Sequence, residues 1–424
     1  MLELTYLRDL RDEAVTRLKK RNIDAEALIA KAVELDGARR NTQNELDARQ
    51  AELNTLSRSI GDLMKSGQKA EAEAARARTT DLKTAIGRLQ DELGAAETAL
   101  RDHLCLIPNA PNSKVPPGKT PEENVTVMQE GAMPSLPENA KPHWELGEEY
   151  GLLHMDLGVK VTGAGFPVYS GQGARLQRAL ISFFLDRAIA AGYVEIIPPH
   201  MVNADSAFGT GQLPDKEGQM YHATVDGLYL IPTAEVPITN LYRDEIIDTA
   251  RLPIKNVGYT PCFRREAGSY GAHVRGLNRV HQFDKVEIVR IEKPENSYAA
   301  LEEMTEHVKG LLRDLELPYR QLLLCGGDMG FASAMTYDME VWAGAQKRWL
   351  EVSSISCFET FQSNRLKLRY KTEDKKTRLL HTLNGSALAL ARIVAALLEN
   401  NQASEGIRIP EALRSYTGFD MIRK

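Results

Sequence analysis

The chain contains few cysteines, and they lie far apart. Its four cysteines are Cys105, Cys262, Cys325 and Cys357, and no two of them form a CxxC pair. Zinc sites and disulfide frameworks are normally built from closely spaced cysteines, or from cysteine and histidine together. We therefore expect reduced thiols in a cytoplasmic protein, and no zinc.

Long apolar runs are also missing. No stretch is long enough to span a bilayer, and the first residues lack the basic-then-apolar pattern of a signal peptide. Charged residues make up 26% of the chain and hydrophobic residues 43%, which is typical of a globular protein. The net charge of −5 indicates no chain-wide attraction to a polyanion, although it permits a local basic face. We expect no membrane partner.

The glycine-rich loops that commonly bind nucleotides are absent as well. Gly118-Lys119-Thr120 resembles the end of a P-loop, but Ser113 stands where that motif requires glycine. No glycine-rich dinucleotide turn occurs, and no histidines have the HExxH spacing of a zinc enzyme. If the protein binds a nucleotide, it must hold it by another device.

Helix-forming residues dominate the chain up to about residue 104, and proline is absent there. Apolar residues repeat every seven positions on both sides of a break at Ser66-Gly67: Leu46, Leu53 and Ile60 before it, Leu82, Leu89 and Ala96 after it. These heptads predict two helices of one chain that pack as an antiparallel coiled-coil hairpin. At a rise of ~1.5 Å per residue, each helix is expected to extend for tens of Å.

The predicted hairpin carries many cations. They are Arg39, Arg40, Arg49, Arg58, Lys65, Lys69, Arg76, Arg78, Lys83 and Arg88. Acidic residues are interspersed, so one interpretation is the solvated surface that every coiled coil needs. The alternative is an arm whose cations contact the phosphates of an RNA.

Composition divides the chain into three regions. Residues 1–107 form the predicted arm, the proline-rich segment 108–124 is a linker, and β-rich runs alternate with amphipathic helices over 125–424. In the third region we expect helices over 173–191, 298–315 and 386–400, and a strand over 192–199. The predicted fold class is α+β, with a mostly antiparallel sheet flanked by helices after the helical hairpin.

Two strand-like runs, 257–266 and 280–291, carry the residues best suited to chemistry. Apolar and polar residues roughly alternate in both, so each strand can direct one set of side chains toward a common cleft. The planar guanidinium of Arg264 suits phosphate or carboxylate, and the ring of Phe283 suits a stacked base. Together they can hold a nucleotide beside an amino acid.

Four short motifs in this order resemble those of bacterial-type seryl-tRNA synthetases, a family of class II aminoacyl-tRNA synthetases. They are the segment 192–199, the tripeptide Thr233-Ala234-Glu235, the run from Phe263-Arg264-Arg265-Glu266 through Arg279, and the segment 384–392. The resemblance covers essentially the whole chain, including the predicted arm. It implies a class II synthetase sheet for the third region.

The resemblance also implies an activity and its partners. Such an enzyme is a ligase that activates L-serine with ATP to seryl-adenylate and transfers the seryl group to the 3′ end of tRNA(Ser), with tRNA(Sec) as a further acceptor. Mg²⁺ accompanies ATP as cofactor. The arm binds the tRNA, and the segment 192–199 forms a homodimer interface.

A serine zwitterion needs a cation for its carboxylate and an anion for its ammonium group. Arg264 can supply the first and Glu235 and Glu287 the second. The resemblance assigns serine recognition to Thr233, Ala234, Glu235, Arg264, Glu287 and Ser386. A pocket with fixed polar partners for the hydroxyl should reject alanine, because those partners would stay unpaired. The alternative is that the two glutamates only form structural ion pairs.

The resemblance assigns ATP to a second set of residues: Arg264, Arg265, Glu266, Arg279, Val280, Phe283, Glu351, Val352, Ser353, Ser354 and Arg392. Arg264 and Arg392 would act on the reacting phosphates, and oxygens of Glu351 and Ser354 would bind Mg²⁺. The alternative interpretations are a core aromatic for Phe283 and a helix-surface arginine for Arg392.

Some positions depart from the family pattern: Ala272-His273, Met335, Cys357 and Ala391. None of these departures removes a ligand named above. Three other functions remain open: a non-catalytic RNA-binding relative, a ligase that loads a carrier protein, and a synthetase for threonine or proline. The last is expected to carry an anticodon domain after the third motif, but only about thirty residues follow Arg392.

Overall fold

A computed structural model describes residues 1–266 and 274–424 of the chain. Its contacts divide the chain into two compact units, which are described separately. The helical unit comprises residues 2–19 and 23–108. The sheet unit comprises residue 1, the short segment 20–22 and residues 109–424.

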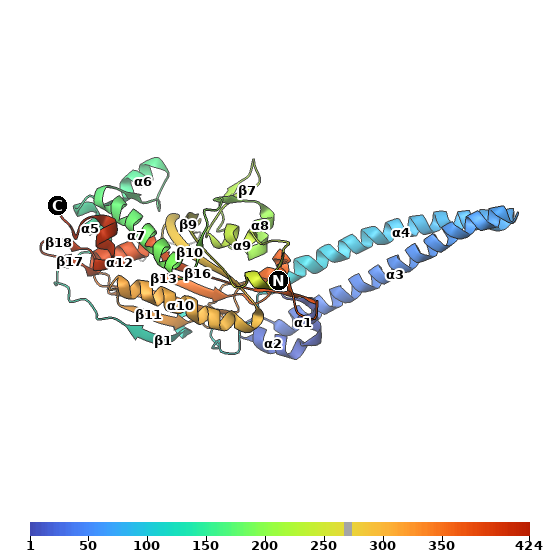
Figure 1. Ribbon diagram of the computed structural model, residues 1–424, viewed down its shortest axis with the longest axis horizontal. Helices are drawn as coiled ribbons and strands as arrows, with labels where there is room; N and C mark the ends of the chain where they lie inside the picture. Colours follow the sequence, from blue (N-terminus) through green and yellow to red (C-terminus); the bar gives the residue numbers. More distant parts are fainter. Residues whose placement is uncertain (267–273) are drawn as a thin grey trace. The chain divides into compact units, whose positions relative to one another are not determined.

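The helical unit is built on two long helices. They are α3 (Ala25–Lys65) and α4 (Lys69–Leu104), preceded by α1 (Leu4–Asp9) and α2 (Arg11–Lys19) (Figure 1). Leu46, Ile86 and Leu89 meet in an apolar cluster between the long helices, as expected for antiparallel partners. The predicted coiled-coil hairpin is therefore confirmed, with its break at Ser66-Gly67.

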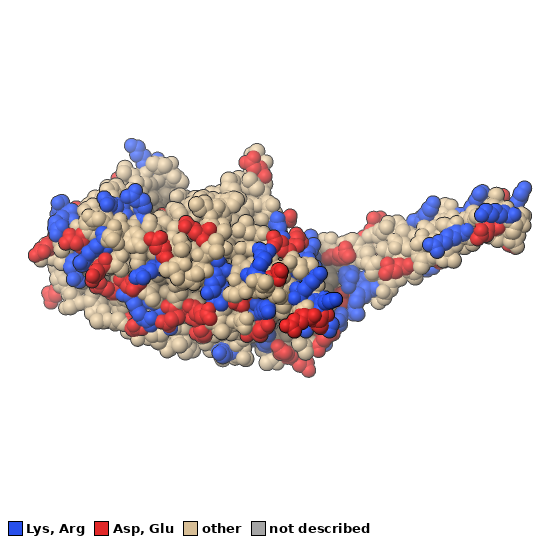
Figure 2. Space-filling model, in the orientation of Figure 1, with Lys and Arg blue, Asp and Glu red and all other residues tan. Residues whose placement is uncertain are grey.

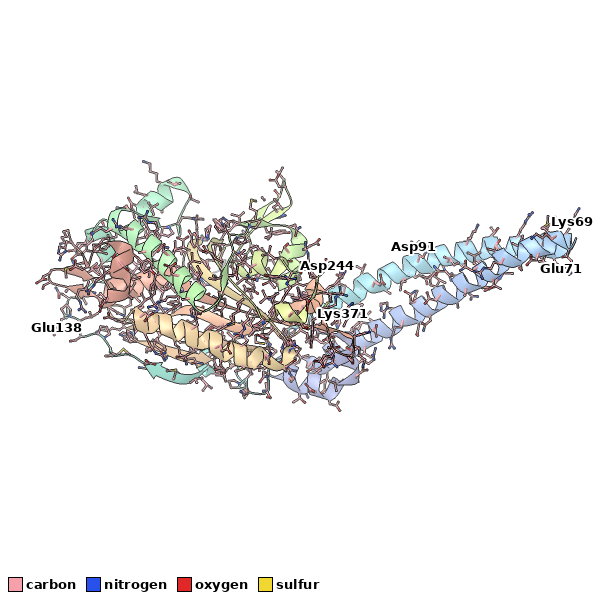
Figure 3. All side chains as sticks on the ribbon, in the orientation of Figure 1. Lys69, Glu71, Asp91, Glu138, Asp244 and Lys371 are labelled. Atoms are coloured by element: carbon pink, nitrogen blue, oxygen red, sulfur yellow. The ribbon has the colours of Figure 1, made fainter. Side chains whose placement is uncertain are left out.

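Figure 2 shows acidic and basic side chains along this hairpin, and Figure 3 labels Lys69 and Glu71 beside the turn that joins its helices. The cations Arg58, Lys65, Lys69 and Arg76 are all exposed near the turn. Arg78, by contrast, forms an ion pair with Glu52 at 2.7 Å. Basic residues near the turn are therefore only partly neutralised by their neighbours.

The sheet unit contains an eight-stranded sheet in the order β1-β11-β12-β13-β16-β10-β9-β4. Its strands are β1 (Val125–Glu130), β11 (Tyr319–Leu323), β12 (Met335–Ala343), β13 (Arg348–Cys357), β16 (His381–Ala389), β10 (Gln282–Glu292), β9 (Ile254–Phe263) and β4 (Val194–Glu195). Neighbours are antiparallel except β4 and β9. This confirms the predicted antiparallel sheet.

Three helices, α7 (Gly171–Ala190), α10 (Ser297–Asp314) and α12 (Leu390–Asn400), pack on one face of this sheet (Figure 1). Alternate strand residues such as Val286 and Ile288 point into the apolar core with them. The intervening residues point to the opposite face. That face therefore remains available for polar groups.

The other elements are short. The helices are α5 (His143–Glu149), α6 (Met155–Val161), α8 (Ala204–Thr210), α9 (Glu235–Asn240), α11 (Phe361–Leu366) and α13 (Glu411–Thr417), with 3₁₀ turns at Pro121–Glu123, Thr249–Arg251 and Pro294–Asn296. The strands are β2 (Leu153–His154), β3 (Val168–Tyr169), β5 (Met201–Val202), β6 (His222–Ala223), β7 (Leu228–Leu230), β8 (Ile246–Ile247), β14 (Arg369–Lys371), β15 (Thr377–Leu379), β17 (Gln402–Ala403), β18 (Gly406–Arg408) and β19 (Met421–Ile422). Among the described residues, no helix combines the length and apolar character needed to cross a membrane.

Two element predictions are wrong in part. The helix expected over 386–400 begins only at Leu390, because residues up to Ala389 form β16 and pair with β10. Sheet pairing here overrides the helix propensity of the Ala- and Leu-rich sequence. The strand expected over 192–199 is reduced to the two residues of β4. The helices expected over 173–191 and 298–315 match α7 and α10.

The predicted linker is residues 108–124, and from residue 109 onward it belongs to the sheet unit. Asn109 donates from its backbone to Phe331 O (2.9 Å) and from Nδ2 to Phe358 O (2.7 Å), and Val115 joins the main core. The division into domains stays a prediction.

Candidate active site

The face of the sheet away from α7, α10 and α12 carries a row of polar side chains. In the strand register, Lys285 of β10 lies opposite Thr260 of β9, and Glu287 lies opposite Ser386 of β16. Directly opposed residues of antiparallel strands share one face. The predicted serine-binding residues Glu287 and Ser386 are therefore neighbours, and Ser386 Oγ donates to Glu287 Oε2 at 3.4 Å.

Lys285 connects this row to the start of helix α9. Its Nζ forms an ion pair with Glu287 Oε2 at 2.6 Å and donates to Thr233 Oγ1 at 2.9 Å. The backbone N–H of Glu235 also donates to Thr233 Oγ1, at 3.2 Å. All four residues are buried. The structure thus brings Thr233, Glu235 and Glu287 together around one ammonium group.

Glu235 is a buried carboxyl in this group. Gln362 Nε2 donates to its Oε1 at 2.6 Å, and Gln362 is itself held by Thr382, whose hydroxyl donates to Gln362 Oε1 at 2.6 Å. Burial raises the pKa of Glu235 to about 7, and the negative charge of Glu287 adds to this effect. Glu235 therefore changes its charge near neutral pH.

Ala234 contributes differently from its neighbours. Its side chain packs with Ile238 and Val289 in a separate apolar cluster. Only its backbone can face a ligand. Val280 and Val352 likewise have their side chains in the main core, and the Ser353 hydroxyl donates to the backbone of Ser386 at 2.6 Å.

Arg264 lies between the cluster that contains Glu235 and Glu287 and the aromatic ring of Phe283. Its guanidinium carbon is 5.3 Å from the ring centroid of Phe283, and its Nε donates to Pro232 O at 3.4 Å. Lys285, Arg264 and Glu287 all act electrostatically on the buried thiol of Cys262, whose pKa is raised first by burial. The predicted residues therefore share one neighbourhood instead of facing separate surfaces.

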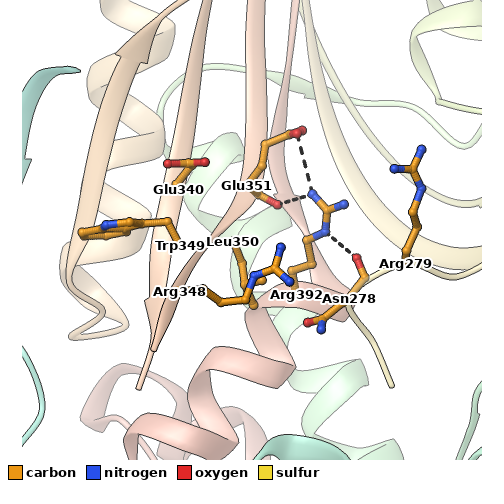
Figure 4. A pocket seen from close by; sticks show the side chains of 8 residues that line it. All are labelled: Asn278, Arg279, Glu340, Arg348, Trp349, Leu350, Glu351 and Arg392. Carbon is orange, nitrogen blue, oxygen red and sulfur yellow. Dashed lines mark hydrogen bonds and ion pairs between the residues drawn. The ribbon is translucent and has the colours of Figure 1, made fainter. Parts of the chain in front are cut away.

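A cavity of about 220 Å³ lies beside the ends of β12 and β13 (Figure 4). It is lined by Asn278, Arg279, Glu340, Arg348, Trp349, Leu350, Glu351 and Arg392. Figure 4 shows Arg392 between Glu351 and Asn278, with Nε donating to Asn278 O at 2.9 Å and a terminal nitrogen donating to Glu351 O at 2.7 Å. Three predicted ATP-binding residues, Arg279, Glu351 and Arg392, thus line one cavity.

Two other predicted ATP-binding residues lie at the end of β9. Glu266 forms an ion pair with Arg279. Arg265 is exposed, and its backbone N–H donates to Gln219 O at 2.9 Å. Ala272 and His273, where the family pattern is broken, lie outside the described residues.

Glu351 and Ser354 lie on the same face of β13 although they are three residues apart. The register places Glu351 opposite Glu340 and Ser354 opposite Asp338, so that β13 has an extra residue between these pairs. Asp338 accepts a hydrogen bond from Ser354, and burial, followed by the charge of Glu351, raises its pKa well above the ordinary value. Its Oδ1 has no hydrogen-bond partner among the described residues.

These oxygens suit a hard cation such as Mg²⁺, which would relieve the repulsion between the carboxyl groups. However, no three His, Cys, Asp or Glu side chains in residues 1–266 and 274–424 lie close enough to hold a metal by themselves. A cation at Glu351 and Ser354 would need further oxygens, such as those of a nucleotide.

Comparison with known proteins identifies the family. A family model for the seryl-tRNA synthetase N-terminal domain matches residues 1–111, and one for the class II core domain of the G, H, P, S and T synthetases matches residues 221–401. Serine–tRNA ligase of Salinibacter ruber is 49% identical over 424 residues, which are 100% of this chain and 99% of the relative. The chain belongs to the seryl-tRNA synthetase family.

Two further comparisons agree with this membership. Serine–tRNA ligase of Akkermansia muciniphila is 47% identical over 100% of this chain and 99% of its own length. Seryl-tRNA synthetase of Pyrococcus horikoshii, solved in complex with ATP, superposes with a TM-score of 0.92 at 33% identity, covering 100% of this chain and 99% of that one.

Sequence reasoning missed three residues that contact the predicted site residues: Lys285, Gln362 and Asn278. Lys285 lies two positions before Glu287 in one strand, so the strand periodicity contained a signal for it. Gln362 lies in α11 and has no local signal. Met335, Cys357 and Ala391 are buried in the main core, which explains why their departures leave the site intact.

Proposed function

We propose that this protein is a serine–tRNA ligase that activates L-serine with ATP and transfers the seryl group to tRNA(Ser). The observation that carries this function is one sheet face where Lys285 and Glu287 of β10 lie near Glu235 at the start of α9 and near Arg264 just after β9. Cation and anions are arranged there for a zwitterion. The proposed ATP-binding residues lie on β10 and β13, in the segments that follow β9 and precede β10, and at the start of α12.

In the proposed complex, the serine ammonium group binds the carboxylates of Glu235 and Glu287, and Arg264 binds the serine carboxylate. Hydroxyl recognition falls to the polar groups around Thr233, Glu235 and Ser386. All of these except Arg264 are buried, so a ligand without a hydroxyl leaves a buried polar group unpaired. Alanine is thereby rejected, whereas threonine is excluded sterically through its extra methyl group.

ATP would lie over Phe283 and along the cavity that Arg279 and Arg392 line. Support comes from the positions of these side chains and from Arg264, which lies over the Phe283 ring and acts on the Cys262 thiol together with Lys285 and Glu287. Because the Arg264 guanidinium covers this ring, a stacked adenine requires Arg264 to shift toward the α-phosphate. Glu266, Val280, Val352 and Ser353 complete the predicted set through backbone or neighbouring contacts.

Mg²⁺ bound by Glu351 and Ser354 would neutralise charge on the phosphates. Asp338 Oδ1, which has no hydrogen-bond partner in the part of the chain that the structure describes, and the same-face placement of the two ligands support this assignment.

The protein residues chiefly position the reactants. The serine carboxylate attacks the α-phosphorus, pyrophosphate leaves, and Arg264 and Arg392 stabilise the charge that moves. The 3′-terminal ribose hydroxyl of the tRNA then displaces AMP from the adenylate. This chemistry needs no protein nucleophile and no histidine base.

The exposed cations near the hairpin turn support the arm as the tRNA-binding element. A homodimer is supported by the edge strand β4, beside which Val194 and Ile197 are 61% and 85% exposed. A second copy of the chain would cover them. The four cysteines are buried and none of them is in a disulfide in the described structure, in keeping with a cytoplasmic location. tRNA(Sec) stays a prediction from the resemblance alone.

Pyrophosphate exchange with serine, threonine, alanine and glycine tests the activity. Serine should support exchange and alanine should not. A pocket built to hydrogen-bond a hydroxyl group discriminates against a ligand that lacks it by a factor of about 10⁴ in kcat/KM. No exchange with any of the four amino acids would favour a non-catalytic RNA-binding relative. Preference for another amino acid would favour a different synthetase or a carrier-loading ligase.

Deletion of residues 36–101 tests the tRNA partner. Adenylate formation should persist, since none of the candidate site residues lies in that segment, while charging of tRNA(Ser) should fall strongly. Unchanged charging by the truncated protein would rule out the arm as the binding element.

A further inference from the structure

Helix α12 carries a buried carboxylate about two turns after Arg392. Glu399 has no exposed surface, yet its two oxygens receive five N–H groups. The donors are His143 N (3.0 Å), His143 Nδ1 (2.8 Å), Gln346 Nε2 (2.8 Å), Ala345 N (3.2 Å) and Gln346 N (3.1 Å). Burial favours the neutral acid, but the hydrogen bonds from His143 hold the pKa of Glu399 below its ordinary value. Glu399 is thus a fixed anion in the core.

His143 joins this anion to the turn at residues 275–279. Its Nδ1 bonds Glu399, and its Nε2 accepts the backbone N–H of Leu277 at 2.8 Å. Because Nε2 accepts, the hydrogen-bond pattern assigns the proton to Nδ1. The imidazole therefore has a defined tautomer, and one buried side chain connects α12 to the turn.

The turn meets His143 and its neighbour at two further points. Gly276 has φ +66°, and a Cβ there would lie 2.4 Å from His143 Nε2 and 3.2 Å from Trp144 Cε3. The Arg275 guanidinium carbon lies 4.9 Å from the centroid of Trp144. Three successive residues of the turn are therefore fixed by the first two residues of α5.

The next residue of the turn reaches the ATP-binding cavity. Asn278 O accepts from Arg392 Nε at 2.9 Å, and Asn278 Nδ2 donates to Gln346 Oε1 at 2.8 Å. Gln346 in turn bonds Glu399. Arg279, which lines the cavity, follows immediately. The network thus starts and ends on α12, at Glu399 and at Arg392.

We propose, on the basis of the function proposed above, that His143 is a positioning residue for ATP. It holds the turn 275–279 so that the Asn278 carbonyl orients Arg392 and so that Arg279 faces the cavity. His143 touches no reacting atom. It acts through the turn, and Glu399 sets its tautomer.

Two substitutions separate the two hydrogen bonds of this imidazole. The Gln side chain of H143Q can place an oxygen near the position of Nε2 and keep the acceptor for Leu277. The Asn side chain of H143N can place its amide near Nδ1 and keep the donor to Glu399, but it loses the turn. The measurement is pyrophosphate exchange at varied ATP and serine, with circular dichroism and thermal melting to establish folding.

H143N should raise the KM for ATP about tenfold or more, and H143Q should raise it less. The KM for serine should stay within about twofold in both, because no hydrogen bond or ion pair among the described residues joins the proposed serine-binding side chains to the turn. H307Q is the matched control: His307 is a partly buried imidazole of α10 whose Nε2 is buried and has no hydrogen-bond partner among the described residues. Its ATP KM should not change.

If His143 has only a structural role, the ATP KM of H143Q should rise more than that of H143N, because H143Q loses the hydrogen-bond donor to buried Glu399. That order, or a folded H143N with an ATP KM within twofold of wild type, would overturn the positioning role. If H143N does not fold, W144L decides instead, because it removes the contact with Arg275, and an unchanged ATP KM would again overturn it.

Calorimetric measurement of ATP binding to the same variants tests the positioning role of His143 independently of the proposed ligase function. Weaker ATP binding by H143N supports the positioning role even if wild-type protein shows no serine-dependent exchange. Serine-dependent exchange with equal ATP binding in all variants would support the proposed function and reject the positioning role.

Discussion

The serine side and the ATP side of the candidate site differ in how far their charges are removed from water. Glu235, Lys285 and Glu287 are only 7%, 4% and 2% exposed, whereas the side chains of Arg279 and Glu351 are 44% and 49% exposed. A buried charge that loses its partner costs far more free energy than an exposed one. The buried serine side, called the closed half below, can therefore select an amino acid. The exposed ATP side, called the open half, binds a ligand that carries its own charges.

Substitution of the residue between the two halves should have the largest effect. R264A should lower serine-dependent pyrophosphate exchange about 10³-fold, because charge on the reacting phosphate loses its fixed partner. R251A, which removes an exposed arginine outside the site, is the control. If a folded R264A protein keeps activity within tenfold of wild type, Arg264 binds neither the serine carboxylate nor the reacting phosphate.

On the closed side, E287Q should raise the KM for serine about 100-fold, since Lys285 and the substrate ammonium group lose a buried counter-charge. The KM for ATP should stay within a few-fold if the halves act separately. Steady-state exchange kinetics at varied serine and varied ATP measure both, with E303Q as an exposed-glutamate control. Equal increases in the two constants would contradict the separation.

The closed side should also respond to pH. Glu235, with a pKa of about 7, is ionised above that pH and can then pair with the serine ammonium group; below it the acid is neutral. The KM for serine should therefore rise about tenfold between pH 8 and pH 6, and the E235Q variant should lose this dependence. If the serine KM of wild-type protein does not depend on pH, the charge of Glu235 does not control serine binding in this pH range.

On the open side, a single substitution should have the smallest effect. R279A should raise the KM for ATP roughly three- to tenfold, because Arg279 is half exposed and already paired with Glu266. Added salt should narrow the difference from wild type, since exposed charges are screened. An effect as large as that of E287Q, insensitive to salt, would show that this half closes on its ligand.

Local patterns in the sequence predict much of the molecule. The helical hairpin follows from heptads within each helix, and the strands β9 and β10 follow from alternation within a few residues. The predicted helix over 386–400 fails at its start because β10, about a hundred residues earlier in the chain, pairs with that segment. Pairing between distant segments has no local signature.

The candidate site shows the same limit. Arg264, Glu235 and Glu287 stand out by residue type and motif, and the structure brings them together. Gln362 reaches Glu235 from 127 positions away, and His143 reaches Leu277 from 134 positions away. Only the folded chain reveals such partners, which determine the charge and orientation of the residues that motifs identify.

The extra residue in β13 determines which side chains of this strand face the proposed Mg²⁺ site. Glu351 and Ser354 share a face only because the strand gains one position between them. A regular ladder through the same four residues would instead turn the Ser354 side chain toward the helices, although every named side chain would still be present. The local conformation of this segment, as much as its residues, therefore determines whether the two side chains can act together.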